Sequence, residues 1–188
     1  MMTAFSQLVE FRREAAALAH LRAYFASDRP HRYKATRNGL AGLDFSSKFS
    51  PWLATGALSP RQIYADLKTF ERDHGANDGT YWLWFELLWR DYFRMLHLQY
   101  GAALYSARGL SALPAARHNA QGFDRWCQGR TGEPLVDAAM RELATTGTLS
   151  NRLRQVVASF LIYDLHADWR AGAAWFESQL VDYDVYSN

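Results

Sequence analysis

Three segments of this 188-residue chain hold the polar side chains best suited to chemistry, and the first is a hydroxyl-rich turn at residues 46–50. Hydroxyl and free amide groups just before a helix bind phosphate well, and the helix dipole favours the negative charge. The same residues also cap helices without binding a ligand, so both interpretations stay open. The phosphate-binding candidates in this turn are Ser46, Ser47 and Ser50.

The second segment covers residues 82–91, where three Trp and one Phe surround the carboxylate of Glu86. Glu86 stands one helical turn before Arg90, and such a surface ion pair contributes only about 0.3–0.5 kcal/mol. In the alternative, Glu86 and Trp89 face a pocket, because a carboxylate among aromatic rings is costly to desolvate unless something binds it. The sequence leaves the surface ion pair and the pocket equally open.

The third segment is the head of a predicted helix over residues 151–165, which starts polar and becomes apolar. Polar groups at the head of an otherwise buried helix usually line a cavity, although the helix end can also simply reach solvent. A buried Arg154 requires an anion, and Asp182 and Asp184 are the natural candidates. Together the three segments predict a pocket for a large, aromatic, phosphate-bearing cofactor. The residues on this side of the helix are Asn151, Arg154, Gln155 and Ala158.

The composition adds an unusual share of aromatic residues, 15%, with seven Trp and ten Tyr. Such residues often stack on a flat ligand or a base, but an aromatic core explains them equally well. The net charge of +2 excludes a chain-wide basic field, so contact with nucleic acid would depend on a local Arg cluster. The single cysteine, Cys127, excludes an internal disulfide and suits a reducing compartment. Since no apolar run reaches about 18 residues, we expect a cytoplasmic protein without a membrane span.

Common catalytic signatures are missing from the sequence. The six His residues lack the spacing of a metal site, so no metal is expected. The G-x-S-x-G, P-loop and G-x-G-x-x-G patterns do not occur either. The three polar segments therefore remain the candidate site.

Helical periodicity dominates the chain, and strand alternation and repeats are absent from the sequence. We therefore expect an all-α fold in one domain over residues 1–188, with residues 31–47 and 101–119 as irregular connections. Pro30 is expected to mark the end of the first helix, and Ser59-Pro60 the start of the second. The predicted helices cover residues 4–26, 60–74, 80–100, 123–128, 134–144, 151–165 and 171–180.

Six apolar residues of the helix predicted over 80–100 recur at spacings of three and four. We expect them to share one buried face, because residues at these spacings lie on the same side of a helix. Glu86 lies on a face that touches this stripe. The six residues are Trp82, Phe85, Trp89, Tyr92, Phe93 and Leu96.

Seven motifs follow one another over nearly the whole chain from about residue 14. They are Tyr33–Leu40, Ser47–Ala54, Phe85–Asp91, Gly129–Gly132, Pro134–Ala138, Ser150–Arg152 and Asp182–Asp184. In this order they resemble the FAD-binding helical domain of the photolyase/cryptochrome family, and in particular that of the DASH cryptochromes. The ordered set is highly specific, and it implies FAD as the cofactor.

The resemblance implies roles toward FAD for individual residues. Tyr33 and the three serines Ser46, Ser47 and Ser50 correspond to positions that hold the FAD phosphates. The family often has Thr where this sequence has Ser46. Arg154 would pair with Asp182 against the isoalloxazine ring, Asp184 would hydrogen-bond the uracil-like edge, and Asn188 would face flavin N5. The implied cofactor-binding residues are Tyr33, Ser46, Ser47, Ser50, Trp89, Arg90, Asn151, Arg154, Asp182, Asp184 and Asn188.

The resemblance also implies residues for the reaction. Glu86 corresponds to the carboxylate that contacts the DNA lesion, and Trp169 to the middle Trp of the family's electron-transfer chain. The outer Trp is expected near Ala116, where the sequence has none, and Trp126 is out of register with it. The implied catalytic residues are Glu86, Trp89, Asn151, Gln155 and Trp169.

The implied activity is the light-driven transfer of an electron from reduced FAD to a cyclobutane pyrimidine dimer in single-stranded or damaged DNA. Two alternatives stay open: a non-catalytic flavin- or nucleic-acid-binding module, such as a blue-light sensor, and an interaction module that has lost FAD. The polar set around Arg154 argues against the second. The family's N-terminal α/β antenna domain has no counterpart in residues 1–188, so we expect a shortened FAD-binding domain without an antenna chromophore.

Overall fold

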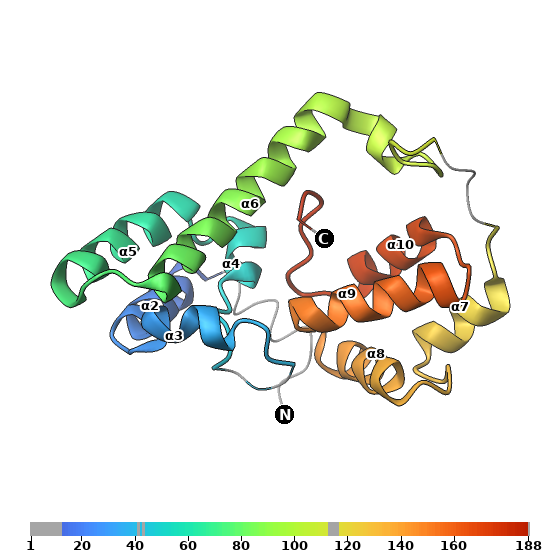
Figure 1. The fold of residues 1–188 in the computed structure, drawn as a ribbon, viewed down its shortest axis with the longest axis horizontal. Helices are drawn as coiled ribbons and strands as arrows, with labels where there is room; N and C mark the ends of the chain where they lie inside the picture. Colours follow the sequence, from blue (N-terminus) through green and yellow to red (C-terminus); the bar gives the residue numbers. More distant parts are fainter. Residues whose placement is uncertain (1–12, 41, 43, 113–116, 188) are drawn as a thin grey trace. The chain divides into compact units, whose positions relative to one another are not determined.

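The computed structural model describes residues 13–40, 42, 44–112 and 117–187, and these ranges contain helices and irregular segments without any strand (Figure 1). This confirms the predicted all-α fold class. The chain divides into two compact units, Met1–Phe93 and Arg94–Asn188, which are described in turn. Within the described ranges, no helix combines the length and the apolar character that crossing a membrane requires.

The first unit is organised around α2 (Glu14–Phe25), which packs against α3 (Arg29–Thr36) and α5 (Pro60–His74). Ser59 caps α5 by accepting a hydrogen bond from the backbone of Arg61, and Pro60 begins the helix, as the sequence predicts. The short α4 (Ser50–Thr55) adds an aromatic side chain to the core. The largest buried residues of this core are Leu21, Tyr24, Tyr33, Phe49, Trp52, Ile63, Leu67 and Leu83.

The helix α3 corrects the prediction of a loop over residues 31–47. Pro30 lies in the first turn of this helix rather than at the end of the preceding one, which ends at Phe25. A proline in the first turn of a helix costs nothing, because the backbone amide that it lacks has no partner there. Pro30 therefore marks the start of α3 and not the end of α2.

The helix α6 (Asp78–Tyr100) begins against α3. Asn77 and Thr80 cap its start reciprocally, since each side chain accepts a hydrogen bond from the other residue's backbone amide at 3.1 Å. Gly79 lies between these two residues, and a Cβ atom on it would collide with the backbone of Pro30 and His31. The close approach of the two helices therefore requires glycine at this position.

The prediction that the six-residue apolar stripe of α6 is buried is wrong. Trp89, Tyr92 and Phe93 are 41%, 50% and 41% exposed, whereas Leu83, which lies off the stripe, is buried in the core. The stripe residues contact one another along the helix instead, with the rings of Trp89 and Phe93 stacked at 5.6 Å. Spacing alone shows that residues share a face of a helix, but it does not show what covers that face.

The second unit contains a 3₁₀ turn at Gly101–Tyr105 and four helices in its described part (Figure 1). The helix predicted over 151–165 is α-helical only to Ser159, and a π-helical turn, Phe160–Asp164, continues it. This wider turn places Leu161 against Gly172, where a Cβ atom would collide with the Leu161 side chain. The four helices are α7 (Ala120–Cys127), α8 (Pro134–Thr146), α9 (Asn151–Ser159) and α10 (Trp169–Gln179).

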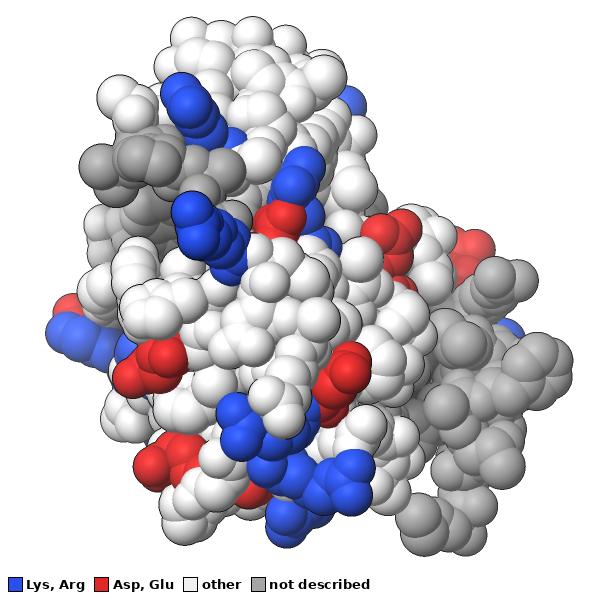
Figure 2. Space-filling model, turned by 90° about the vertical axis from the view of Figure 1, so that its right-hand side faces the viewer, with Lys and Arg blue, Asp and Glu red and all other residues white. Residues whose placement is uncertain are grey.

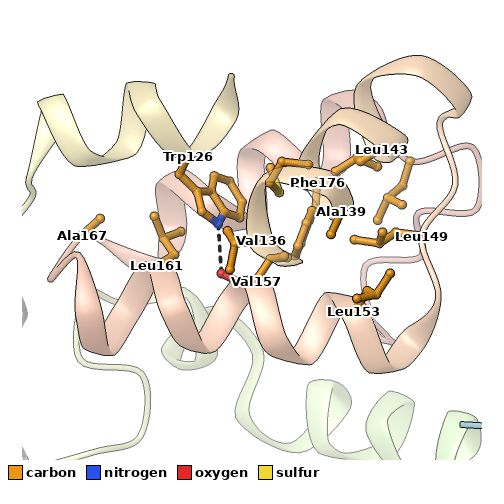
Figure 3. Close-up of a cluster of buried hydrophobic side chains, with 12 residues drawn as sticks. Trp126, Val136, Ala139, Leu143, Leu149, Leu153, Val157, Leu161, Ala167 and Phe176 are labelled. Carbon is orange, nitrogen blue, oxygen red and sulfur yellow. Dashed lines mark hydrogen bonds between the residues drawn. The ribbon is translucent and has the colours of Figure 1, made fainter. Parts of the chain in front are cut away.

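Trp126 lies at the centre of the core of this unit (Figure 3). Its side chain is fully buried, and its indole Nε1 donates a hydrogen bond to the carbonyl oxygen of Val157 at 2.9 Å. The ring stacks at 6.1 Å on Phe123 and meets Phe176 at 5.7 Å. A buried Trp with a satisfied N–H group both fills and orients a core, so Trp126 fixes α7 against α9 and α10.

Asp137 on α8 organises the turn that precedes this helix. Its carboxylate accepts hydrogen bonds from the backbone amide and the hydroxyl of Thr131, each at 2.7 Å, and from the amide of Gly132 at 3.1 Å. Burial would raise the pKa of Asp137, but these hydrogen bonds and the nearby Arg141 outweigh burial and lower the pKa below 3.8. The charged form is therefore the one that the fold stabilises.

The Asp137→Asn variant should lose about 2 kcal/mol of unfolding free energy at neutral pH, because hydrogen bonds to a charged acceptor are the strong ones. The contribution of Asp137 is complete above its unfolded pKa near 3.8 and disappears as the pH falls through the lowered native pKa. Urea unfolding of the parent should therefore show a steeper loss of stability in acid than that of the variant. Equal stability at neutral pH would contradict this role.

Candidate functional site

The candidate phosphate-binding residues of the first unit lie on α3 and on the loop before α4. Tyr33 on α3 is only 9% exposed, and burial raises the pKa of its hydroxyl. Ser46 and Ser47 are half-buried, and Ser50 is exposed as the first residue of α4. His20 on α2 contacts this loop by a hydrogen bond from Nε2 to the carbonyl oxygen of Ser47, at 2.7 Å.

Glu86 on α6 forms an ion pair with Arg37, the residue at which α3 ends. The Arg37 guanidinium also lies 4.3 Å above the ring of Trp82, so it bridges the carboxylate and an indole. The side chains of Arg37 and Glu86 are 25% and 33% exposed. The pair joins residues 49 positions apart, and no local spacing in the sequence could have indicated it.

Trp89 and Arg90 follow on the same helix. Trp89 is exposed and lies edge-on to Phe85 at 5.9 Å. Arg90 donates a hydrogen bond from Nη2 to the carbonyl oxygen of Leu53 in α4, at 3.5 Å. Trp89 thus offers a flat aromatic surface, and Arg90 connects α6 to the helix that follows the serine-rich loop.

In the second unit, Arg154 and Asp182 form the ion pair that the sequence predicts. One nitrogen of Arg154, Nη2, donates to both carboxylate oxygens of Asp182, at 2.7 and 2.9 Å, while Nε donates to the carbonyl oxygen of Leu149 at 3.0 Å. The side chains are 19% and 8% exposed. A buried pair is tolerated only when both partners are well satisfied, and this geometry fixes the segment after α10 against the start of α9.

Asn151 and Gln155 are exposed along α9. The side-chain oxygen of Gln155 accepts a hydrogen bond from Arg152 at 2.8 Å. Gln155 and Arg152 also line an open groove of about 560 Å³ that continues to Phe160 and Asp164. These amides can therefore reach a ligand without any rearrangement of the core.

Trp169 begins α10, and its indole N–H donates to the carbonyl oxygen of Ala107 at 3.3 Å. It lines an apolar cavity of about 170 Å³ together with Trp126 and Tyr183. The carboxylate of Asp184 accepts a hydrogen bond from the backbone of Tyr186 at 3.1 Å. Asn188 and Ala116, which the sequence analysis singled out, lie outside the described residues.

The candidate site has the types of polar group that a flavin dinucleotide requires. Phosphates require hydroxyl groups and amides, and these occur in the serine-rich loop. A polar ring system requires fixed donors and acceptors, which the Arg154–Asp182 pair provides. In the described ranges, no group of His, Cys, Asp and Glu side chains is placed so that it could hold a metal ion.

Known proteins match this chain in sequence and in structure. A family model described as the FAD binding domain of DNA photolyase matches residues 82–188. The cryptochrome DASH of Xenopus laevis is 56% identical over 178 residues, which are 93% of this chain and 34% of that protein. That of Danio rerio is 54% identical, over 93% of this chain and 34% of that protein. The chain thus spans about a third of the length of the curated relatives it matches.

Two solved structures extend the likeness to the fold. The structure of a Synechocystis cryptochrome has a TM-score of 0.89 at 55% identity, over 93% of this chain and 36% of that one. A class III photolyase from Agrobacterium tumefaciens has a TM-score of 0.79 at 32% identity, over the same shares. These findings confirm the predicted family, the helical fold class and FAD as its cofactor. The chain belongs to the photolyase/cryptochrome family, as an FAD-binding domain of the DASH cryptochrome type.

Proposed function

We propose that this chain is the flavin-holding part of a light-driven enzyme that splits cyclobutane pyrimidine dimers in single-stranded DNA. The observation that carries the proposal is the Arg154–Asp182 pair, because it presents a fixed, charge-balanced polar group at the position implied for the flavin ring. When bound and reduced, FAD supplies the photoexcited electron donor. The protein supplies binding, orientation and exclusion of water.

The residues divide these tasks between them. Tyr33 and the serines of residues 46–50 hold the FAD phosphates, and Arg154, Asp182 and Asp184 orient the flavin ring. Asn188, outside the described residues, belongs to this cofactor set by family position alone. Arg90 and Trp89 are assigned to cofactor binding by family position.

A second set of residues acts on the DNA lesion. Glu86 and Asn151 are assigned to the flipped-out dimer by family position. Gln155 lies one turn after Asn151, and both side chains are exposed. The exposed aromatic surface of Trp89 offers a base a stacking partner. Trp169 takes the middle position of the family's electron-transfer chain, whose outer position, near Ala116, has no Trp in this sequence. A target base must leave its stack to reach such a site, and single strands have no base pairing to oppose that step.

The charge distribution suits single-stranded DNA better than a long duplex. On the face drawn in Figure 2, Lys and Arg side chains are interspersed with Asp and Glu, and most of the surface is uncharged. The net charge of the chain is only +2. With a net charge this small, electrostatic contact with a duplex backbone is weak, so stacking and hydrogen bonding must contribute most of the affinity.

A second candidate function is flavin binding without repair, as in a blue-light sensor. The specific observation in its favour is the contact of Arg37 with Glu86, which engages Oε1 of the carboxylate implied for lesion binding. In this function the Glu86–Arg37 pair is structural, and the polar set around Arg154 still serves the flavin.

The first test illuminates the protein. Purified with FAD, the chain should show the visible bands of a bound flavin. With a reductant and blue light it should restore normal bases in a dimer-bearing single-stranded oligonucleotide, and it should not do so in the dark. Bound flavin with unchanged dimer supports the sensor function, whereas a colourless protein that takes up no FAD overturns both.

The second test removes Asp182. The Asp182→Ala variant leaves the Arg154 charge without its carboxylate, so it should lose about 3 kcal/mol of unfolding free energy and bind FAD at least tenfold less tightly. Urea unfolding and FAD titration measure the two effects.

The matched control is the Arg154→Leu, Asp182→Leu double variant, which removes the stranded charge. It should regain much of the stability but not the affinity for FAD. Parent-like FAD binding in either variant would show that this pair does not orient the flavin.

A further inference from the structure

His20 on α2 is half-buried against the loop that precedes α4, and the sequence motifs assign it no role. Its Nε2 lies 2.7 Å from the carbonyl oxygen of Ser47, across 27 residues of sequence. A carbonyl oxygen only accepts hydrogen bonds, so the proton of this contact is on Nε2. The histidine thus holds the backbone of the loop and leaves the serine hydroxyl groups available.

The ring of His20 has little freedom to leave this position. It lies 4.6 Å from the ring of Trp52 with the planes tilted by 31°, and it meets Phe49 edge-on at 5.6 Å. Burial, aided by the charge of Arg29, lowers the pKa of His20 although the hydrogen bond to Ser47 opposes this shift. A neutral ring has a single N–H group, and here that group serves Ser47.

The loop itself has an unusual backbone next to this contact. Lys48 has φ of +55°, a left-handed conformation that costs a residue with a side chain roughly 1 kcal/mol. The conformation persists only because its surroundings fix it. Phe49, the residue after Lys48, is 2% exposed and is anchored in the core. The Lys48 ammonium group lies 3.5 Å above the ring of Phe45. His20 anchors the preceding residue, Ser47.

We propose that His20 is a positioning residue for phosphate binding: its hydrogen bond to the Ser47 carbonyl keeps the strained serine-rich loop in the shape that receives the FAD phosphates. The inference rests on the proposed function and deepens it. It predicts that substitution of His20 weakens binding of the phosphate-bearing part of FAD and leaves binding of the flavin ring unchanged.

The test compares two ligands and two variants of the full chain. FAD carries phosphates, and riboflavin has the same ring system without them. The His20→Phe variant keeps an aromatic ring against Trp52 but removes the N–H donor, whereas His20→Gln places an amide donor where Nε2 stood. Flavin fluorescence titration should show FAD binding weakened five- to tenfold in His20→Phe, riboflavin binding unchanged, and FAD binding restored in His20→Gln.

Thermal unfolding of each variant separates positioning from a general loss of structure. Should His20→Phe fail to fold, His20→Asn provides the same comparison against His20→Gln, because its shorter side chain cannot reach Ser47. Unchanged FAD affinity, or an equal loss for FAD and riboflavin, overturns the role of His20. A parent protein that binds riboflavin but gains nothing from the phosphates overturns it too, and a parent that binds neither ligand overturns the proposed function itself.

Discussion

The ion pair of Arg154 and Asp182 is the interaction on which the candidate site of the second unit depends. It fixes the segment after α10, which the buried side chains of Leu180 and Val181 also hold. Two neighbouring contacts act in the same direction. The Val181 amide donates to the carbonyl oxygen of Gly147 at 2.9 Å, and Gly147 has φ of +69° and passes so close to Val181 that a Cβ atom would lie 2.8 Å from its side chain. The end of α8, the start of α9 and the segment after α10 are thereby held as one structure.

In the first unit, an ion pair also balances a charged residue of the candidate site. Glu86 stands among aromatic rings, and Arg37 both neutralises its charge and covers the ring of Trp82. In each unit a charged residue of the candidate site is paired with a residue from a distant element. The Arg154–Asp182 pair needs no large rearrangement when a flavin arrives, and such preorganisation lowers the cost of binding, whereas Arg37 occupies an oxygen of Glu86 that lesion binding would use.

Proline, glycine or a capping side chain allowed some helix boundaries to be predicted, but α7 and α10 begin at Ala120 and Trp169, after the capping residues Asn119 and Asp168, and not at residues 123 and 171 as predicted. Ser59-Pro60 predicted the start of α5, and Gly147 the end of α8, because these residues act through local geometry. The same logic failed at Pro30, since a proline can follow one helix or begin the next and only the structure shows which. It failed for the face of α6 because the burial of Trp89 and Phe93 depends on what packs against them, which spacing does not encode.

The candidate site shows the same division between local and tertiary information. The Arg154–Asp182 pair was predictable although its residues lie 28 positions apart, since an arginine at the head of a buried helix demands an anion and the family resemblance implies Asp182 as its partner. The contacts of Arg37 with Glu86 and of His20 with Ser47 could not be predicted, because no motif or spacing in the sequence assigns either residue a partner. Motifs thus predict candidate residues for ligand binding, whereas the residues that hold those candidates in place become visible only in the folded structure. The serine-rich loop illustrates the consequence: its hydroxyl groups are visible in the sequence, but the left-handed Lys48 that shapes the loop, and the histidine that holds Ser47 beside it, are properties of the packed chain.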